Sequence, residues 1–364
     1  MAKQAVKSSW TAKDSLAELT ALAYSAGTEV VGELTQKMSA PSKLTYLGKG
    51  KMEDLRKLKN DLNYDTVIAD DELTPLQQQN LEEFLEAKVI DRVDVILDIF
   101  ARRARTREGK LQVELAQYEY NLPRLAGKWH HLERLGAGIG TRGPGESQLE
   151  TDKRIMRQKI RRLKQQIEQL RSQRELSRKN RRRSAIPVVA LVGYTNTGKS
   201  TMLNALSRAK VLVKDELFST LDPTTRRLLL PDNHWILLTD TVGFIRHLPP
   251  ALIEAFSATL EELTEASLLV HVVDLTAHNA AEQFEAVEDL LRDLNIVDKP
   301  RITALNKIDL LLAPQRHWDE QAAQDYYITK CGQLAADNVL ISATRRWGFN
   351  RLLEMISQKL ALIT

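Results

Sequence analysis

The chain has 364 residues, 43% of them hydrophobic and 27% charged, with a formal net charge of +4, which is typical of globular proteins and excludes a chain disordered throughout. This length allows two or three domains with separate hydrophobic cores. A single cysteine excludes an internal disulfide, and the lack of Cys/His clusters with zinc spacing excludes a zinc module. No apolar run is long enough for a membrane span or a signal segment. We therefore expect a cytoplasmic protein.

The first third of the sequence alternates helical and strand patterns, which predicts a small α/β domain with a mainly parallel sheet. Helices are expected over residues 14–26, 49–60 and 75–87, the last of them capped by Thr74, and short strands over 29–34, 66–69 and 88–90. Residues 1–9 show no convincing strand, so the order and completeness of this sheet stay open.

Two long helices are expected next, over residues 93–122 and 151–183. A glycine-rich stretch, Leu135 to Glu146, separates them and is expected to be a loop, because glycine adopts backbone conformations that other residues avoid. The second helix carries one apolar stripe that can pair with the first, which predicts a helical hairpin. The stripe consists of Met156, Ile160, Leu163, Ile167 and Leu170.

The charge is concentrated in the second of these helices. Residues 151–183 contain 14 Lys/Arg and three Asp/Glu, so this stretch carries +11 and the rest of the chain carries 4 − 11 = −7. Too few acids are present for intrahelical ion pairs to neutralise it, and a polyanion such as ribosomal RNA is the expected partner. The glycine-rich loop is either an RNA-contacting tip or a plain connector, and Trp129, His130 and His131 either stack on bases or, for Trp129, pack against the hairpin.

A phosphate-binding loop follows the apolar strand 188–192. The run Gly193-Tyr194-Thr195-Asn196-Thr197-Gly198-Lys199-Ser200 matches the P-loop pattern, and a helix is expected after it. In this pattern backbone N–H groups cradle the phosphates, Lys199 reaches the β/γ oxygens and Ser200 binds Mg²⁺. We therefore expect the segment from Gly193 to Thr201 to bind a nucleoside triphosphate.

Four further segments indicate the nucleotide and its chemistry. Asp240-Thr241-Val242-Gly243 follows a strand; Asp240 is expected to hold the metal and Gly243 to meet the γ-phosphate, and Thr224 is expected as the metal-sensing threonine. In Asn306-Lys307-Ile308-Asp309 the aspartate can accept two hydrogen bonds from guanine, and Ser342-Ala343-Thr344 can close the base pocket. The predicted catalytic residues are Lys199, Thr224 and Gly243, and the predicted metal ligands are Ser200, Thr224 and Asp240.

These motifs together resemble those of the HflX family of translation-factor-related GTPases. The resemblance includes Phe218 to Thr224, Asp240 to Pro249, Arg142 to Asp152 and Ile99 to Glu114, and it extends from about Ala26 to the C-terminus. It implies an N-terminal domain with a helical hairpin, a GTPase domain, binding to the large ribosomal subunit, and splitting of stalled or idle ribosomes under stress.

Two positions bear on hydrolysis. Phe244 stands where Ras-type GTPases have the glutamine that orients the attacking water, so slow intrinsic hydrolysis and stimulation by a partner are expected. Asn196 either holds a potassium ion beside the phosphates, as in some relatives of the superfamily, or only tolerates the turn.

The sequence thus predicts an α/β protein with three parts: a small α/β domain (1–95), a helical hairpin (96–186) and a P-loop GTPase domain (187–364). Its expected function is GTP-dependent binding to the large ribosomal subunit, as a monomer when free, to split subunits or prevent their joining. A ribosome-assembly GTPase, an RNA-remodelling ATPase, which Asp309 argues against, and an RNA-binding scaffold with an idle pocket are the alternatives.

Overall fold

The computed structural model describes residues 10–125, 144–183, 186–207, 217–218, 220–246, 257–313 and 317–363. The chain forms two compact units. The N-terminal unit consists of Thr11–Arg171 with Pro249–Ala255, and the sheet unit consists of Met1–Trp10, Ser172–Leu248 and Phe256–Thr364. Among the described residues, no helix has both the length and the apolar character that a membrane span needs.

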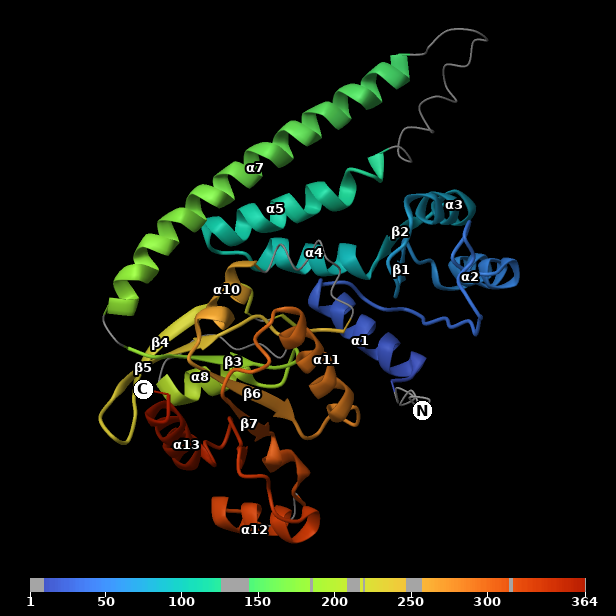
Figure 1. Ribbon diagram of the computed structural model, residues 1–364. Helices are drawn as coiled ribbons and strands as arrows, with labels where there is room; N and C mark the ends of the chain where they lie inside the picture. The colour runs from blue at the N-terminus through green and yellow to red at the C-terminus, as the bar shows by residue number, and fades with distance from the viewer. Residues whose placement is uncertain are drawn as a thin grey trace, which may run out of the picture. The chain divides into compact units, whose positions relative to one another are not determined.

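The N-terminal unit contains a two-stranded parallel sheet covered by helices (Figure 1). Leu55, Leu81 and Val89 belong to its hydrophobic core. Thr74 caps the third helix as predicted, because its hydroxyl accepts a hydrogen bond from Gln77 N at 3.2 Å. The elements are α1 (Ala12–Ser25), α2 (Lys49–Leu62), β1 (Thr66–Ala69), α3 (Pro75–Leu85) and β2 (Lys88–Asp91).

The strand predicted over residues 29–34 is wrong, because this segment has no regular secondary structure. Its apolar side chains do not share one buried face: Val31 is 48% exposed, although Leu34 packs against the core. Side chains hold the segment instead, with Thr20 Oγ1 donating to Glu33 Oε1 at 3.0 Å and Gly48 N donating to Gln36 Oε1 at 2.9 Å.

The single helix predicted over residues 93–122 is two helices, α4 (Arg92–Arg103) and α5 (Arg107–Asn121). Ala104 leaves the helical conformation with ψ 114°, and Thr106 starts α5 by accepting a hydrogen bond from Gly109 N at 3.0 Å. Threonine favours such caps, because its hydroxyl satisfies a backbone donor that the helix itself cannot.

Helix α7 (Pro144–Arg183) is longer than predicted and runs beside α5 (Figure 1). Leu163, from the predicted apolar stripe, is 2% exposed, and Lys159 and Lys164 pair with Glu114 and Glu119 of α5 at 3.1 and 2.7 Å. The loop was predicted to extend to Glu146, but the helix already begins at Pro144. Proline is favoured at the first position of a helix, because it has no N–H group that would need a partner there. The rest of the glycine-rich stretch, together with Trp129, His130 and His131, lies outside the described residues.

The sheet unit is built on a six-stranded sheet in the order β4-β5-β3-β6-β7-β8, in which only the edge strand β4 is antiparallel. Helices α8 and α13 pack on one face, and α11 packs on the other, where His271 stacks on Phe284. This confirms the predicted mainly parallel sheet with flanking helices. The strands are β3 (Val188–Val192), β4 (Thr224–Leu229), β5 (Trp235–Asp240), β6 (Leu268–Asp274), β7 (Arg301–Asn306) and β8 (Asn338–Leu340), and the helices are α8 (Lys199–Ser207), α10 (Ser257–Glu265), α11 (Ala280–Asp293), η1 (Ile308–Leu311), α12 (Glu320–Cys331) and α13 (Phe349–Ala361).

Candidate nucleotide-binding site

The loop between β3 and α8 has the geometry of a phosphate cradle. Gly193 and Gly198 adopt φ angles of 151° and 95°, which other residues rarely reach. A Cβ atom on Gly193 would overlap the Val272 carbonyl oxygen, and one on Gly198 would overlap the Asn306 amide nitrogen. The loop therefore needs glycine at both positions, and α8 begins directly after it at Lys199, with its N-terminus available to an anion.

Lys199 is buried at the centre of this loop. Its Nζ donates to the carbonyl oxygens of Gly193 at 3.0 Å and Tyr194 at 2.6 Å. Burial lowers the pKa of Lys199 to about 8, and the nearby Asp240 opposes this shift. A buried cation of this kind would gain strongly from a phosphate group placed beside it.

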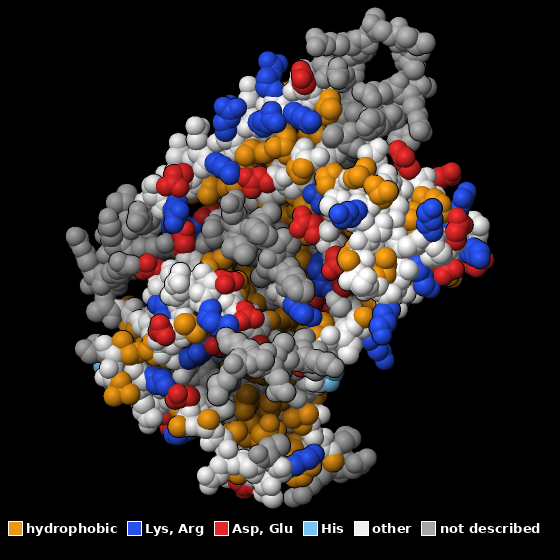
Figure 2. All heavy atoms as spheres, turned by 45° about the vertical axis from the view of Figure 1, so that its right-hand side comes forward, with side chains coloured by type: hydrophobic (Ala, Val, Ile, Leu, Met, Phe, Trp, Pro, Cys, Tyr) orange, Lys and Arg blue, Asp and Glu red, His pale blue; other side chains and the backbone are white. Residues whose placement is uncertain are grey.

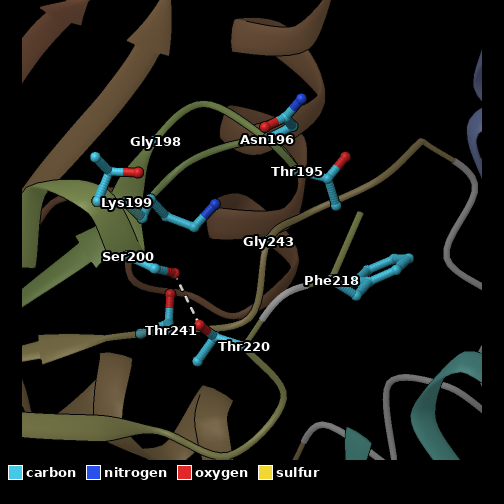
Figure 3. Close-up of a pocket in the computed structure, with 10 residues that line it drawn as sticks. Thr195, Asn196, Gly198, Lys199, Ser200, Phe218, Thr220, Thr241 and Gly243 are labelled. Carbon is cyan, nitrogen blue, oxygen red and sulfur yellow. Dashed lines mark hydrogen bonds between the residues drawn. The ribbon is translucent and has the colours of Figure 1, made fainter. Parts of the chain in front are cut away.

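Ser200, Thr220 and Asp240 bring three oxygen groups together next to the lysine. Ser200 Oγ donates to Asp240 Oδ2 at 2.6 Å, Thr220 Oγ1 donates to the same oxygen at 2.9 Å, and the two hydroxyls are 2.8 Å apart (Figure 3). Burial raises the pKa of Asp240, while Lys199 and the two hydroxyls oppose the shift. The other carboxylate oxygen, Oδ1, is buried without a hydrogen-bond partner among the described residues. Hard oxygen ligands around one carboxylate fit Mg²⁺, which binds proteins through few side chains and keeps several waters.

Thr224, the predicted metal-sensing residue, is not part of this group. It is the first residue of β4 and lies opposite Asp240 in the antiparallel pairing with β5. Thr220, four positions earlier in the same motif, lines the pocket and contacts Ser200 and Asp240 instead. In this arrangement Thr220 rather than Thr224 contacts Ser200 and Asp240, because Thr224 belongs to β4; binding of the metal by Thr224 stays a prediction.

The segment after β5 is bound closely to the P-loop. Thr195 N donates to Phe244 O at 2.7 Å, and Phe244 N donates to Gly193 O at 3.1 Å. A Cβ atom on Gly243 would lie 2.8 Å from Thr195 Cα, so only glycine permits this approach. Thr241 donates its hydroxyl to Leu191 O at 2.6 Å, and Val242 is buried, so these two residues anchor the segment.

Most of the predicted phosphate-side residues line one pocket, with Asn196 and Lys199 on opposite sides of the loop (Figure 3). Asn196 has a φ of 59°, a conformation that asparagine tolerates better than most residues. Sequence reasoning missed Phe218 and Thr220; the motif from Phe218 to Thr224 contains both, but it offers more than one threonine. The lining consists of Thr195, Asn196, Gly198, Lys199, Ser200, Thr201, Phe218, Thr220, Thr241 and Gly243.

The predicted base-binding segments are joined to the P-loop through Asn306. Its Nδ2 donates to Thr197 O at 2.8 Å, and its Oδ1 accepts from Ala343 N at 3.0 Å. Asn306 is buried, and these two hydrogen bonds join the P-loop to the segment that begins at Ser342; its contact with a base stays a prediction.

The carboxylate expected to read guanine lies close by. Thr344 Oγ1 donates to Asp309 Oδ2 at 3.2 Å, while Ser342 Oγ and Thr344 Oγ1 are 3.1 Å apart. Lys307 adopts a left-handed conformation and pairs with Asp274 at 2.7 Å. The two segments thus lie together, with Asp309 oriented by a neighbouring hydroxyl.

Three family models match consecutive parts of the chain. They are described as the GTP-binding GTPase N-terminal region (residues 13–101), the GTP-binding GTPase middle region (103–181) and a 50S ribosome-binding GTPase (188–307). A solved GDP complex of the protein SsGBP is 26% identical, with a TM-score of 0.51 over 95% of this chain and 96% of that one.

Curated relatives match over most of the length. The GTPase HflX of Caldanaerobacter subterraneus is 49% identical over 98% of this chain and 79% of its own length. The GTPase HflX of Escherichia coli is 44% identical over 82% of this chain and 70% of its own length. The chain therefore belongs to the HflX family and is a GTPase.

Proposed function

We propose that this GTPase binds the large ribosomal subunit in its GTP state and splits ribosomes, or prevents their subunits from joining, in the cytoplasm under stress. Hydrolysis, stimulated by the ribosome, then releases the protein, which is a monomer when free. Membership of a family whose GTPase model is described as 50S ribosome-binding supports the choice of partner.

The observation that carries this proposal is the cationic surface of α7. Lys159 and Lys164 are used in pairing with α5, but most other cations of the described part of α7 face solvent. Figure 2 shows lysine and arginine side chains gathered on this part of the surface. Such a surface suits the phosphates of RNA, which bind clustered cations regardless of base sequence. The exposed arginines are Arg154, Arg157, Arg161, Arg162 and Arg171.

The site residues divide the hydrolysis chemistry among them. Lys199 would bind the β and γ oxygens, Ser200, Thr220 and Asp240 would hold Mg²⁺, and Gly243 would donate its N–H to the γ-phosphate. When bound, Mg²⁺ neutralises charge that develops on the phosphate oxygens. Phe244 is 4% exposed and offers no side-chain hydrogen bond to water, so the resting enzyme lacks a group that positions the nucleophile. Stimulation by the ribosome would supply it.

Asn196 is a candidate ligand for a second cation besides Mg²⁺. We propose that its side chain, at the edge of the phosphate pocket, holds K⁺ beside the β–γ bridge. GTP turnover should then be faster in potassium than in sodium buffer, and Asn196→Ser should remove the difference. Equal rates of the unmodified protein in the two buffers would refute potassium use.

Sedimentation tests the main proposal. Purified ribosomes are run on sucrose gradients with the protein and GTP, GDP or a non-hydrolysable GTP analogue. We expect the protein to migrate with large subunits in the analogue, and intact ribosomes to decrease. Association that is the same with GDP, or absent in every nucleotide, would contradict the proposal. Binding only to precursor subunits would favour an assembly role instead.

A further inference from the structure

The chain passes between the two compact units at several points, and two of them lie in described parts of the chain: Trp10 to Thr11 and Arg171 to Ser172. Near each point, on the side of the sheet unit, a side chain contacts another part of that unit: one contacts Arg246, and the other contacts Glu261 of α10. These side chains are Trp10 and Arg174, and both belong to the same unit as the P-loop.

Trp10 lies against the P-loop and the segment after Gly243. Its ring centroid is 6.3 Å from that of Tyr194, and the Arg246 guanidinium carbon is 5.4 Å from the Trp10 ring centroid. Arg246 N also donates to the Tyr194 hydroxyl at 2.9 Å, so the three residues form one group. This group is continuous with the backbone hydrogen bonds that join Phe244 to the P-loop.

The chain between Trp10 and helix α1 is too short to absorb a displacement of Trp10. Helix α1 begins at Ala12, and Thr11 and Asp14 cap it reciprocally: Asp14 N donates to Thr11 Oγ1 at 3.2 Å, and Thr11 N donates to Asp14 Oδ2 at 2.8 Å. The backbone that leaves Trp10 is therefore fixed within one residue to a formed helix.

Arg174 makes the corresponding contact on α7. Its Nη1 lies 3.9 Å from Glu261 Oε2 on α10, and the two side chains are only 24% and 18% exposed. Leu260 and Leu263 of α10 are buried, so Glu261 belongs to a packed helix rather than a loose end. An ion pair shielded from water in this way is stronger than one on an open surface. Because α7 is one uninterrupted helix, the segment that holds Arg174 also carries the exposed arginines from Arg154 to Arg171.

We propose that Gly243–Arg246 and α10 pass the nucleotide state to the N-terminal unit through both connections, Trp10 and Arg174. A γ-phosphate that draws the Gly243 N–H toward it must disturb the hydrogen bonds of Phe244 and Arg246, and with them the contact to Trp10. Helix α10 packs against β3, the strand that leads into the P-loop, so a change around the phosphates also reaches α10 and its partner Arg174. The contacts of Trp10 and Arg174 are then of different strength in the GTP and GDP states. Coupling between two sites requires such a difference between the two states.

A charge-exchange cycle tests the α7 contact. The measured quantity is the ratio of the dissociation constants of purified large subunits for the GDP form and for the non-hydrolysable analogue form. For the unmodified protein we expect a ratio in the range of about 5 to 150, which is usual for allosteric coupling. Arg174→Glu and Glu261→Arg should each lower the ratio, although the first removes a cation and the second adds one. The double variant should restore the ratio. Arg171→Glu, an exposed arginine one turn earlier, should weaken both forms equally and keep the ratio.

Trp10→Ala tests the other connection, with the exposed Trp235→Ala as its control. We expect Trp10→Ala to lower the ratio and Trp235→Ala to keep it. Unchanged GDP affinity would show that each variant has an intact nucleotide site. If Trp10→Ala or Arg174→Glu has the same ratio as the unmodified protein, the inference is wrong, while the proposed function is unaffected. A ratio of one in the unmodified protein contradicts the proposed function, on which the inference rests.

Discussion

The buried ammonium group of Lys199 gives nucleotide binding a defined pH dependence. Its pKa of about 8 in the nucleotide-free protein means that it is charged below pH 8 and loses its proton as the pH rises through this value. A bound phosphate favours the charged form and raises the pKa again, so binding is coupled to protonation. The contribution of Lys199 to GDP affinity should be fully present below pH 8. Above pH 8 the affinity should fall, by at most about tenfold per pH unit.

Isothermal titration between pH 7 and 10 measures this effect. Lys199→Arg is the matched control, because a guanidinium stays charged over the whole range. The nucleotide's own ionisation affects both proteins alike, so the difference between the two curves reports Lys199. Parallel curves would show that the lysine does not titrate in this range.

Thr220 and Thr224 can be separated experimentally. Removing an outer-shell group of a metal site usually costs about 10- to 100-fold in affinity or activity, and a direct ligand should cost at least as much. Thr220→Ala should therefore weaken magnesium-dependent GTP hydrolysis by about this factor, measured as phosphate release at varied Mg²⁺. Thr224→Ala, in β4, should stay close to the unmodified rate. The opposite order would restore the assignment made from the sequence.

The P-loop could be located from sequence because a strand, two glycines at fixed positions and a helix N-terminus form the site within one short segment. The choice of Thr220 over Thr224 could not be made in this way. It depends on where β4 begins to pair with β5, and that is decided by residues distant in sequence. Asn306 is a similar case: its pattern was recognisable, but its role in joining two loops depends on packing.

The pair of helices α5 and α7 is stabilised by burial more than by charge. Leu163 is almost fully buried, and truncation of a buried leucine to alanine usually costs 2–5 kcal/mol, so we expect Leu163→Ala to lower the free energy of unfolding by about that amount. Lys159→Ala removes an ion pair whose partners are about 40% exposed and should cost at most about 1 kcal/mol.

Urea denaturation followed by helical circular dichroism compares these two variants. GDP binding, measured alongside, should be the same in both, because neither residue lies in the sheet unit. A Lys159→Ala variant as unstable as Leu163→Ala would mean that ion pairs, not the apolar stripe, hold the helices together.

Periodicity predicted most elements but not their ends or interruptions. Residues 101–108 contain no proline or glycine to mark a break, so one helix was predicted where a threonine cap creates two. Residues 29–34 contain two β-branched valines, which favour a strand, yet no neighbouring strand pairs with them among the described residues. Both errors arise because periodicity reports which face is apolar and not whether hydrogen-bond partners are present.

The uneven charge of the whole molecule should appear in the salt dependence of ribosome binding. Each lost phosphate contact lowers the slope of log affinity against log salt concentration by about 1. Replacing Arg154, Arg157 and Arg161 by glutamine should therefore reduce this slope stepwise in filter-binding assays with large subunits. Lys159→Gln and Lys164→Gln remove the same charge per residue from side chains paired with α5, and each should change the slope less than an arginine replacement does. Equal effects of the two sets would show that only total charge matters.

Helix α7 has 40 residues, and at a rise of 1.5 Å per residue it is about 60 Å long. A rod of that length acts as a lever. A tilt of only about 10° at Arg174 would carry the Pro144 end, about 45 Å away, through roughly 8 Å, given the same helical rise. A sub-ångström adjustment around a phosphate can in this way become a movement wide enough to decide whether two large bodies fit together.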